Sequence, residues 1–339
     1  MQLMCQYRKR GSSPQRVKSN MRIIDTHCDT LLRCFLDKDW KLSDNEGHIS
    51  ISKMRSGGAL AQFFAIYIDR DEFPEMSHYD KFSEMHRIYE REIALNSEHI
   101  APALCEADIL KNMAEGRMSS ILAIEDGVVV DDSMERLEEV YQKGVRLITL
   151  TWNYENAIGY PCSNHQEEHI KGLKSFGIEA VERMNELGII VDVSHLSEGG
   201  FYDVARLSKK PFIASHSCAR QLCDHRRNLT DDQLRTLGEK GGFVGVNFCS
   251  AFLREGSNHA SIDDIVRHTV YMADKAGIES VGMGSDFDGI DNTLEMKDYA
   301  GYPLVMDALF KALHPVGDRH DMQQKHNESD KRNHEITDV

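Results

Sequence analysis

The chain has 339 residues, of which 41% are hydrophobic, 28% charged and 8% aromatic. This composition is typical of a globular protein and excludes a collagen-like chain, a coiled-coil rod and wholesale disorder. The 40 basic and 55 acidic side chains give a formal net charge of −15, which repels phosphate backbones, so we expect no nucleic-acid partner.

The two ends of the chain differ from its middle. Residues 1–20 carry five basic side chains, no acidic one and no apolar core of a secretory signal, so we expect a disordered leader, with Met21 a candidate start. Residues 318–339 contain only three apolar side chains, too few to offset the entropy of ordering, which favours disorder over a solvated helix. The sequence therefore predicts one ordered domain over residues 21–317.

Within this domain, short apolar runs alternate with amphipathic stretches. The apolar runs predict eight strands, at residues 22–26, 60–68, 119–125, 145–151, 189–194, 211–215, 242–248 and 280–285. The amphipathic stretches predict helices at residues 80–95, 133–143, 175–187, 198–207, 231–240 and 261–276. Apolar strands separated by helices favour a parallel sheet that is covered on both faces.

Eight strand–helix units in about 300 residues predict a (β/α)8 barrel of the TIM type. The alternative is an open doubly wound sheet, which would need a glycine-rich phosphate loop after an early strand, and no G-x-G-x-x-G occurs there.

The eight cysteines are scattered along the chain without a C-x-x-C pair, which is typical of a reducing compartment. No apolar run approaches the roughly 18–20 residues of a membrane-spanning helix. We therefore expect a cytoplasmic location and no membrane partner.

Metal-ligand side chains follow five of the eight predicted strands, at the end where barrel enzymes place their chemistry. They are His27 and Asp29 after the first strand, Glu125 after the third, His195 after the fifth, His216 after the sixth, and Asp286 and Asp288 after the eighth. Imidazoles and carboxylates are the donors that Zn²⁺-type ions take, and a closely spaced pair of ions needs a bridging carboxylate. The coincidence of five strand ends predicts a metal site, although each residue alone would more often be an ordinary loop residue.

Several motifs, in this order, resemble those of the renal (membrane) dipeptidase family of zinc peptidases, and most closely its soluble bacterial branch. They are IIDTHCDT, ILAIEDG, LITLTWNYEN, GIIVDVSHLS, PFIASHSCAR, HRRNLTDDQ, GGFVGVNF and GMGSDFDG, and the resemblance covers about residues 21–312. The family belongs to the metal-dependent amidohydrolases and has a (β/α)8 barrel, so the resemblance implies a dipeptidase with a two-metal site at the C-terminal ends of the strands.

The resemblance also implies a role for each matching residue. His27 and Asp29 would bind one zinc ion, His195 and His216 the other, Glu125 would bridge them, Asp286 would be the catalytic acid/base, and Arg227 would hold the terminal carboxylate of a dipeptide. Manganese or cobalt also suits such ligands. The family often dimerises, which makes a homodimer possible. Nothing in the family requires the second carboxylate, Asp288, which is interpreted either as a residue that supports the metal ligands or as a structural one.

Physical chemistry agrees with these roles. Two metal ions lower the pKa of a shared water to about 7, and a nearby carboxylate can take its proton and pass it to the leaving amine. A guanidinium matches the two oxygens of a carboxylate, which would explain a preference for dipeptides over proteins. On spacing alone, Arg227 would instead be interpreted as part of a surface salt bridge.

The chain departs from the family pattern in two places. Trp152 occupies the position of a family histidine that helps to polarise the substrate carbonyl, so Trp152 is at most a weak substrate contact, and Asn153, Tyr154 or His165 is an alternative donor. After about Leu313 the chain turns polar where the family continues with further helix, so the last barrel helix is expected to be short. Two other functions therefore stay open: another amidohydrolase acting on a small carboxylate-bearing amide or lactone, and an inactive metal-binding member.

Overall fold

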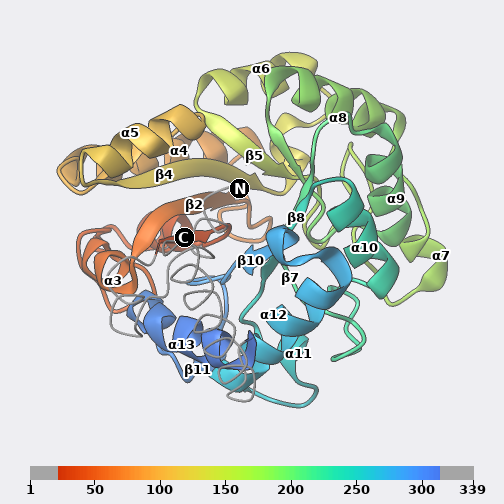
Figure 1. Ribbon diagram of the computed structural model, residues 1–339. Coiled ribbons are helices and arrows are strands. Elements are labelled where there is room, and N and C mark those ends of the chain that lie inside the picture. The colour runs from red at the N-terminus through yellow and green to blue at the C-terminus, as the bar shows by residue number, and fades with distance from the viewer. Residues whose placement is uncertain (1–21, 314–339) are drawn as a thin grey trace, which may run out of the picture.

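Eight parallel strands form a closed barrel in the computed structural model, which describes residues 22–313. The barrel strands are β1 (Ile23–Asp25), β2 (Ala59–Tyr67), β4 (Met118–Glu125), β5 (Val145–Thr149), β6 (Ile190–Asp192), β7 (Ile213–Ser217), β8 (Phe243–Val246) and β10 (Val281–Met283). Their order is β2-β1-β10-β8-β7-β6-β5-β4, and the pairing of β2 with β4 closes the ring (Figure 1). All eight predicted strands and the predicted barrel are confirmed.

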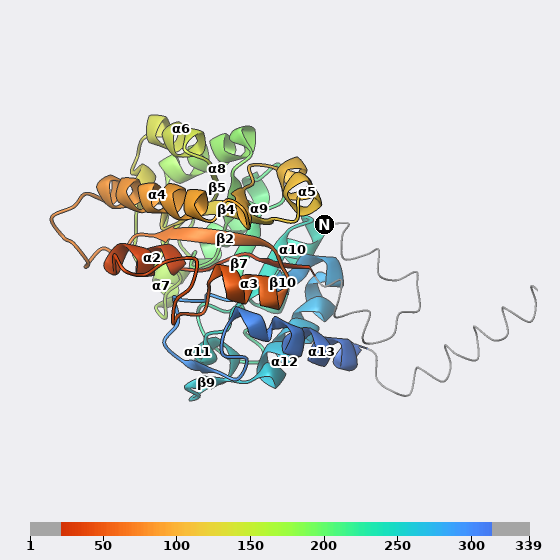
Figure 2. The same cartoon turned by 90° about the vertical axis from the view of Figure 1, so that its left-hand side faces the viewer.

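Helices surround the barrel, and most of them pack against its strands (Figure 1). They are α2 (Thr30–Leu36), α3 (Ile51–Gly57), α4 (His78–Leu95), α5 (Glu106–Ala114), α6 (Met134–Gln142), α7 (Gln166–His169), α8 (Ser175–Leu187), α9 (Glu198–Leu207), α10 (Asp231–Glu239), α11 (Ser250–Leu253), α12 (Ile262–Ala276) and α13 (Tyr302–Leu313). In the side view, α2 and α4 lie against β2 (Figure 2). The six predicted helices are present, and the other six are mostly short.

Three short strands were not predicted. β3 (Ile100–Pro102) pairs with the first residues of β4. On the same side of β4, the pairing with β5 begins at Leu122. β9 (His259–Ala260) and β11 (Thr293–Leu294) form a separate two-stranded sheet. A run of two or three residues shows no alternation, and a proline at the end of β3 argues against a strand, so these elements left no clear signal in the sequence.

The last helix, α13, ends at Leu313, where the sequence turns polar. It buries Tyr302, Val305 and Leu309, whereas Leu304 is 56% exposed. The predicted leader (1–20) and tail (318–339) lie outside the described residues.

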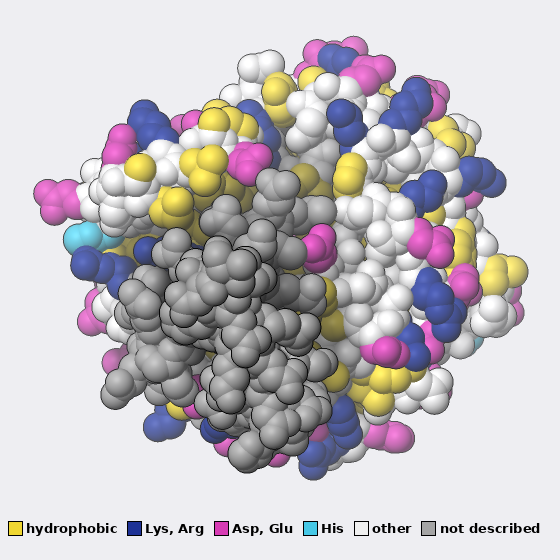
Figure 3. Space-filling model, in the orientation of Figure 1, with side chains coloured by type: hydrophobic (Ala, Val, Ile, Leu, Met, Phe, Trp, Pro, Cys, Tyr) yellow, Lys and Arg dark blue, Asp and Glu magenta, His cyan; other side chains and the backbone are white. Residues whose placement is uncertain are grey.

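The described surface carries charges of both signs side by side, and Figure 3 shows Lys and Arg interspersed with Asp and Glu on one face. No described helix combines the length and the apolarity that a membrane crossing requires.

Candidate active site

Five buried side chains converge where β1, β4, β6 and β7 end. They are His27, Asp29, Glu125, His195 and His216, and none is more than 8% exposed. Glu125 is the last residue of β4 and His216 lies within β7, whereas the other three follow the ends of their strands. Because parallel strands deliver their carboxyl ends to one rim of a barrel, residues far apart in sequence meet here. The structure thus brings together all five predicted metal ligands.

The first half of the site is a triangle of donor atoms. His195 Nε2 lies 3.1 Å from His216 Nε2 and 3.1 Å from Glu125 Oε1, and His216 Nε2 lies 3.4 Å from Glu125 Oε1. A tetrahedral zinc with ligands at about 2.0–2.1 Å sets its donor atoms roughly 3.3–3.4 Å apart. The triangle therefore has nearly the size that one such ion requires.

The second half uses the other oxygen of Glu125. His27 Nε2 lies 3.4 Å from Glu125 Oε2 and 3.4 Å from Asp29 Oδ2. Each oxygen of Glu125 thus faces a different group of donors, which is how a carboxylate bridges two ions. Among the described residues, neither ring nitrogen of His27 has a hydrogen-bond partner, and Asp29 Oδ1 has none either, although all three atoms are buried.

Such orphaned buried atoms are uncommon, because a buried polar group without a partner costs free energy. Burial raises the pKa of Asp29 to about 8. Burial and the nearby Arg227 guanidinium lower the pKa of His195 to about 3, which leaves a neutral ring with a free lone pair. A cation would satisfy the orphaned atoms and stabilise the Asp29 carboxylate, so the residues present fit a metal centre.

Asp286 lies at the open side of this centre. Its Oδ1 is 3.9 Å from His27 Nε2, and its Oδ2 accepts a hydrogen bond of 2.9 Å from Asn247 Nδ2. Its side chain is 16% exposed, against 4% for Asp29 and 5% for Glu125. Asp286 is therefore the site carboxylate that an incoming molecule reaches most readily.

Arg227 is buried beside the histidines, so the interpretation as a surface salt bridge is wrong. Its guanidinium donates to His216 O at 3.2 Å and to Ser217 Oγ at 3.5 Å, and lies over the Phe252 ring at 5.5 Å. Within residues 22–313 it forms no ion pair with a carboxylate, and its Nε has no partner. A buried cation without a counter-ion is poised to take an anion from outside.

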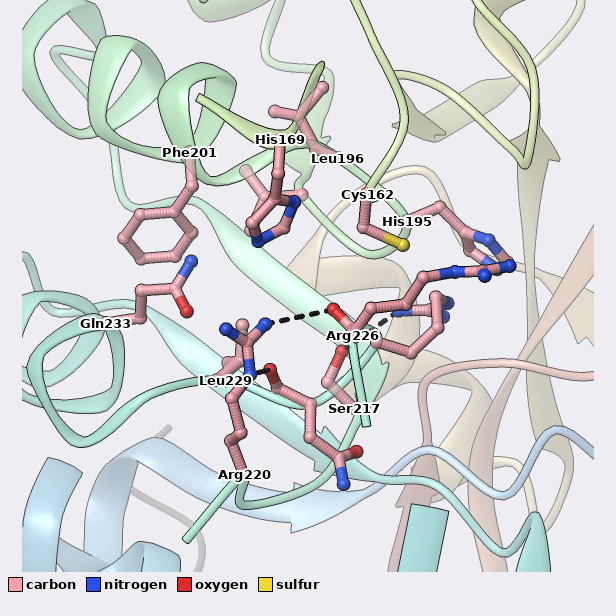
Figure 4. A pocket seen from close by; sticks show the side chains of 13 residues that line it. Cys162, His169, His195, Leu196, Phe201, Ser217, Arg220, Arg226, Leu229 and Gln233 are labelled. Atoms are coloured by element: carbon pink, nitrogen blue, oxygen red, sulfur yellow. Dashed lines mark hydrogen bonds between the residues drawn. The ribbon is translucent and has the colours of Figure 1, made fainter. Parts of the chain in front are cut away.

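Arg227 also lines a small cavity that extends behind His195. Figure 4 shows its wall, which includes His169, Phe201, Arg220 and Arg226. The space holds roughly one water molecule. Its lining includes the three arginines Arg220, Arg226 and Arg227 and no carboxylate.

Trp152 stands at the edge of the site, with its ring 6.0 Å from the His195 ring and 5.0 Å from the Tyr67 ring. Of the alternative donors, Asn153 places Oδ1 3.1 Å from His195 Nδ1 and so orients that ring. Tyr154 packs on Trp152, and His165 precedes α7.

Asp288 is a structural residue, because its carboxylate accepts hydrogen bonds of 2.6 Å from both Thr30 Oγ1 and His48 N.

Other supporting residues left no signal in the sequence. Asn247 orients Asp286, and Asp192 and Ser215 lie behind His216. Each acts across neighbouring strands, and a single sequence does not show which residues face one another across a barrel. Asp25, the last residue of β1, points away from the site and accepts hydrogen bonds from Ser285 and Tyr302.

Comparison with known proteins identifies the family. A sequence model of the membrane dipeptidase family, peptidase family M19, matches residues 12–317. An uncharacterised dipeptidase of Schizosaccharomyces pombe is 34% identical over 303 residues, covering 83% of this chain and 73% of the relative.

Two solved structures share the fold. A metallopeptidase of Rhodobacter sphaeroides, bound to a phosphinate mimic of L-Ala-D-Ala, superposes with a TM-score of 0.78 at 27% identity, covering 88% of this chain and 94% of the other. A dipeptidase of family M19 superposes with a TM-score of 0.79 at 28% identity, with the same coverage. The chain therefore belongs to the membrane dipeptidase family, peptidase family M19, and is a metallo-dipeptidase.

Proposed function

We propose that this protein hydrolyses the peptide bond of free dipeptides with two zinc ions held by His27 and Asp29, by His195 and His216, and by Glu125 between them. The observation that carries this proposal is the position of Glu125, whose two oxygens face two separate groups of donors. Manganese or cobalt is an alternative occupant, since nitrogen and oxygen ligands suit all three metals.

When bound, the metal pair supplies a hydroxide at neutral pH and a positive charge for the developing oxyanion. Asp286 takes the proton of the attacking water and delivers it to the leaving nitrogen. Its Oδ2 is held by Asn247, so the side chain keeps one orientation while Oδ1 faces the centre. Asp286 thereby serves as base and then as acid in one turnover.

Arg227 binds the terminal carboxylate of the substrate. It is buried without a counter-ion, so a substrate that supplies one gains charge-assisted hydrogen bonds. This favours a dipeptide, or another small amide with a free carboxylate, over a protein chain. Trp152 forms the adjoining wall and contacts the substrate through its ring.

The test measures metal content and activity on the same sample. We expect about two zinc ions per chain, hydrolysis of L-L dipeptides and of L-Ala-D-Ala, and loss of hydrolysis after chelation that added zinc reverses. L-Ala-D-Ala is included because the Rhodobacter sphaeroides neighbour binds its mimic. A metal-loaded sample that cleaves no dipeptide contradicts the proposal, and cleavage of a lactone instead supports another amidohydrolase.

We further propose a cytoplasmic location, supported by the absence of disulfides among the seven described cysteines. A homodimer is proposed from the family resemblance alone.

A further inference from the structure

The two halves of the metal site differ in what lies behind them. Behind His216, Ser215 Oγ lies 2.7 Å from the ring nitrogen Nδ1, and the same hydroxyl donates to Asp192 Oδ2 at 2.5 Å. Asp192 is fully buried at the end of β6, and within the described chain it pairs with no cation. A buried carboxylate thus connects to a predicted metal ligand through one hydroxyl.

The surroundings of Asp192 fix the directions of the hydrogen bonds that link Asp192, Ser215 and His216. Its Oδ1 accepts from the backbone amides of Ser194 at 2.9 Å and Ser215 at 2.8 Å, and its Oδ2 also accepts from Thr149 Oγ1 at 2.6 Å. Because the single proton of the Ser215 hydroxyl goes to Asp192, its oxygen must accept from His216. The His216 ring therefore carries its proton on Nδ1 and leaves the Nε2 lone pair facing Glu125 and His195.

The half formed by His27 lacks such support. Among residues 22–313, its Nδ1 has no hydrogen-bond partner, and its Nε2 faces only the carboxylates of Asp29 and Glu125, each at 3.4 Å. Asp25, two residues before His27, accepts a hydrogen bond of 3.3 Å from the backbone amide of His27. Its remaining side-chain hydrogen bonds come from Ser285 and Tyr302, not from the His27 ring. Within the described chain no acceptor behind the ring holds the proton of His27 on Nδ1, while the two carboxylates in front of it attract that proton to Nε2.

We propose that Asp192, acting through Ser215, is a positioning residue that holds the Nε2 lone pair of His216 toward the site, and that the His195–His216 half consequently binds the first metal ion. This inference rests on the proposed metal centre. In that half both rings are set in advance, since Asn153 orients His195 and Ser215 orients His216. The His27 half must order its ring as it binds, which weakens its affinity.

The first experiment reads the ring proton directly. Long-range ¹H–¹⁵N correlation on the metal-free protein should show His216 protonated on Nδ1, with a His216→Gln variant assigning the signal. Asp192→Asn should move that proton. The oxygen of the new asparagine would face the two backbone amides, so its amide nitrogen would donate to Ser215 Oγ. The Ser215 hydroxyl would then donate its own proton to His216 Nδ1, and the ring proton of His216 would have to sit on Nε2. An unchanged tautomer in Asp192→Asn overturns the proposal.

The second experiment titrates zinc into metal-free protein against a chromophoric chelator. Ser215→Ala should weaken the first binding step roughly 10–100-fold, and Ser215→Thr, which keeps the hydroxyl, should restore it. The matched control is Thr149→Val, which removes a hydrogen bond from the same oxygen of Asp192 without touching His216. An equal loss in Ser215→Ala and Thr149→Val would show that general packing is responsible and would reject the relay.

The order of binding is tested with Asp29→Asn, which removes a ligand of the other half. This variant should weaken binding of the second zinc ion and leave binding of the first unchanged. Weaker binding of the first ion would contradict the proposed order. These readouts need no substrate. If the protein binds two zinc ions in this order but cleaves no dipeptide, the proposed function fails while the inference stands.

Discussion

Four residues at the rim of the barrel adopt left-handed backbone although none is glycine. They are Asp126 (φ 76°), His195 (φ 67°), Asp286 (φ 62°) and Asp288 (φ 66°). Such a conformation costs about 1–3 kcal/mol for a residue with a side chain and tends to occur at functional sites. Glycine would remove the strain at each position, but it would also remove an imidazole or carboxylate that the surrounding structure uses. The strain is therefore explained by the side chains that these positions carry.

Arg227 gives the sharpest prediction for a single residue. Arg227→Gln should lower kcat/KM for a dipeptide roughly tenfold to a hundredfold, mainly through KM, because charge-assisted hydrogen bonds to the terminal carboxylate are lost. The measurement compares a dipeptide with its C-terminal amide, which carries no carboxylate. The amide should respond little to the substitution.

The matched control is Arg235→Gln on the surface of α10, where the side chain is 52% exposed and pairs with Asp231 and Asp232. It should leave both substrates unaffected. An equal loss for the dipeptide and its amide in Arg227→Gln would refute carboxylate binding by Arg227.

At the scale of elements, the strands and the convergence of the proposed ligands were predictable, and the supporting contacts were not. β4, for example, is an apolar run that ends in Glu125. The sequence alone therefore indicated that this element is a strand, where it ends, and which side chain at its end is the proposed metal ligand. The contact between Asp192 and Ser215 joins two strands through their register, and the contact between Asn153 and His195 joins two loops. Both depend on which elements become neighbours, which local patterns do not specify. β3 was missed because its short run ends in Pro102, and a proline argues against a strand.

The contact between α12 and the loop that carries Arg227 predicts a pH dependence of stability. His268 is fully buried, accepts from the backbone amide of Ala219 at 3.1 Å through Nδ1, and contacts Leu253 O at 3.0 Å through Nε2. Burial lowers the pKa of His268 to about 4. This folded-state pKa lies below the unfolded value of about 6.5. The contribution of neutral His268 to the free energy of unfolding is therefore complete above pH 6.5 and declines as the pH falls toward 4.

The shift corresponds to at most roughly 3 kcal/mol of unfolding free energy. Urea unfolding of the metal-free protein should show that the wild type loses more stability than His268→Gln between pH 7 and pH 5. Glutamine keeps an acceptor and a donor but does not titrate. The other groups titrate in both proteins, so the difference isolates His268, and parallel stability curves would refute the assignment.

At the scale of the molecule, the proposed metal ligands come from strands on different sides of the barrel. β1, β4, β6 and β7 each supply at least one, so the two proposed ions, linked through Glu125, would together join segments up to 189 residues apart, from His27 to His216. An ion that binds only the folded state adds about 2.7 kcal/mol of stability at a free concentration one hundred times its Kd.

Removal of metal should therefore lower Tm by several degrees, and added zinc should restore it. Calorimetry on chelated and zinc-loaded samples checks this. Glu125→Gln, which weakens the bridging ligand, should reduce the difference between the two samples. A Tm that does not respond to metal would contradict a centre that ties the strands together.

The hydrogen bond between Tyr302 and Asp25 joins residues 277 positions apart and has a consequence for biosynthesis. Asp25 lies two residues before His27 and is fully buried, so its carboxylate finds two of its donors only when Ser285 and Tyr302 arrive. A ribosome makes the first strand early and α13 last. The hydrogen bonds that hold Asp25, two residues before His27, are therefore completed only after the last described helix has been made, whereas Glu125, His195 and His216 all precede both donors in the chain. Support at the His27 half of the proposed site is thus the last to form.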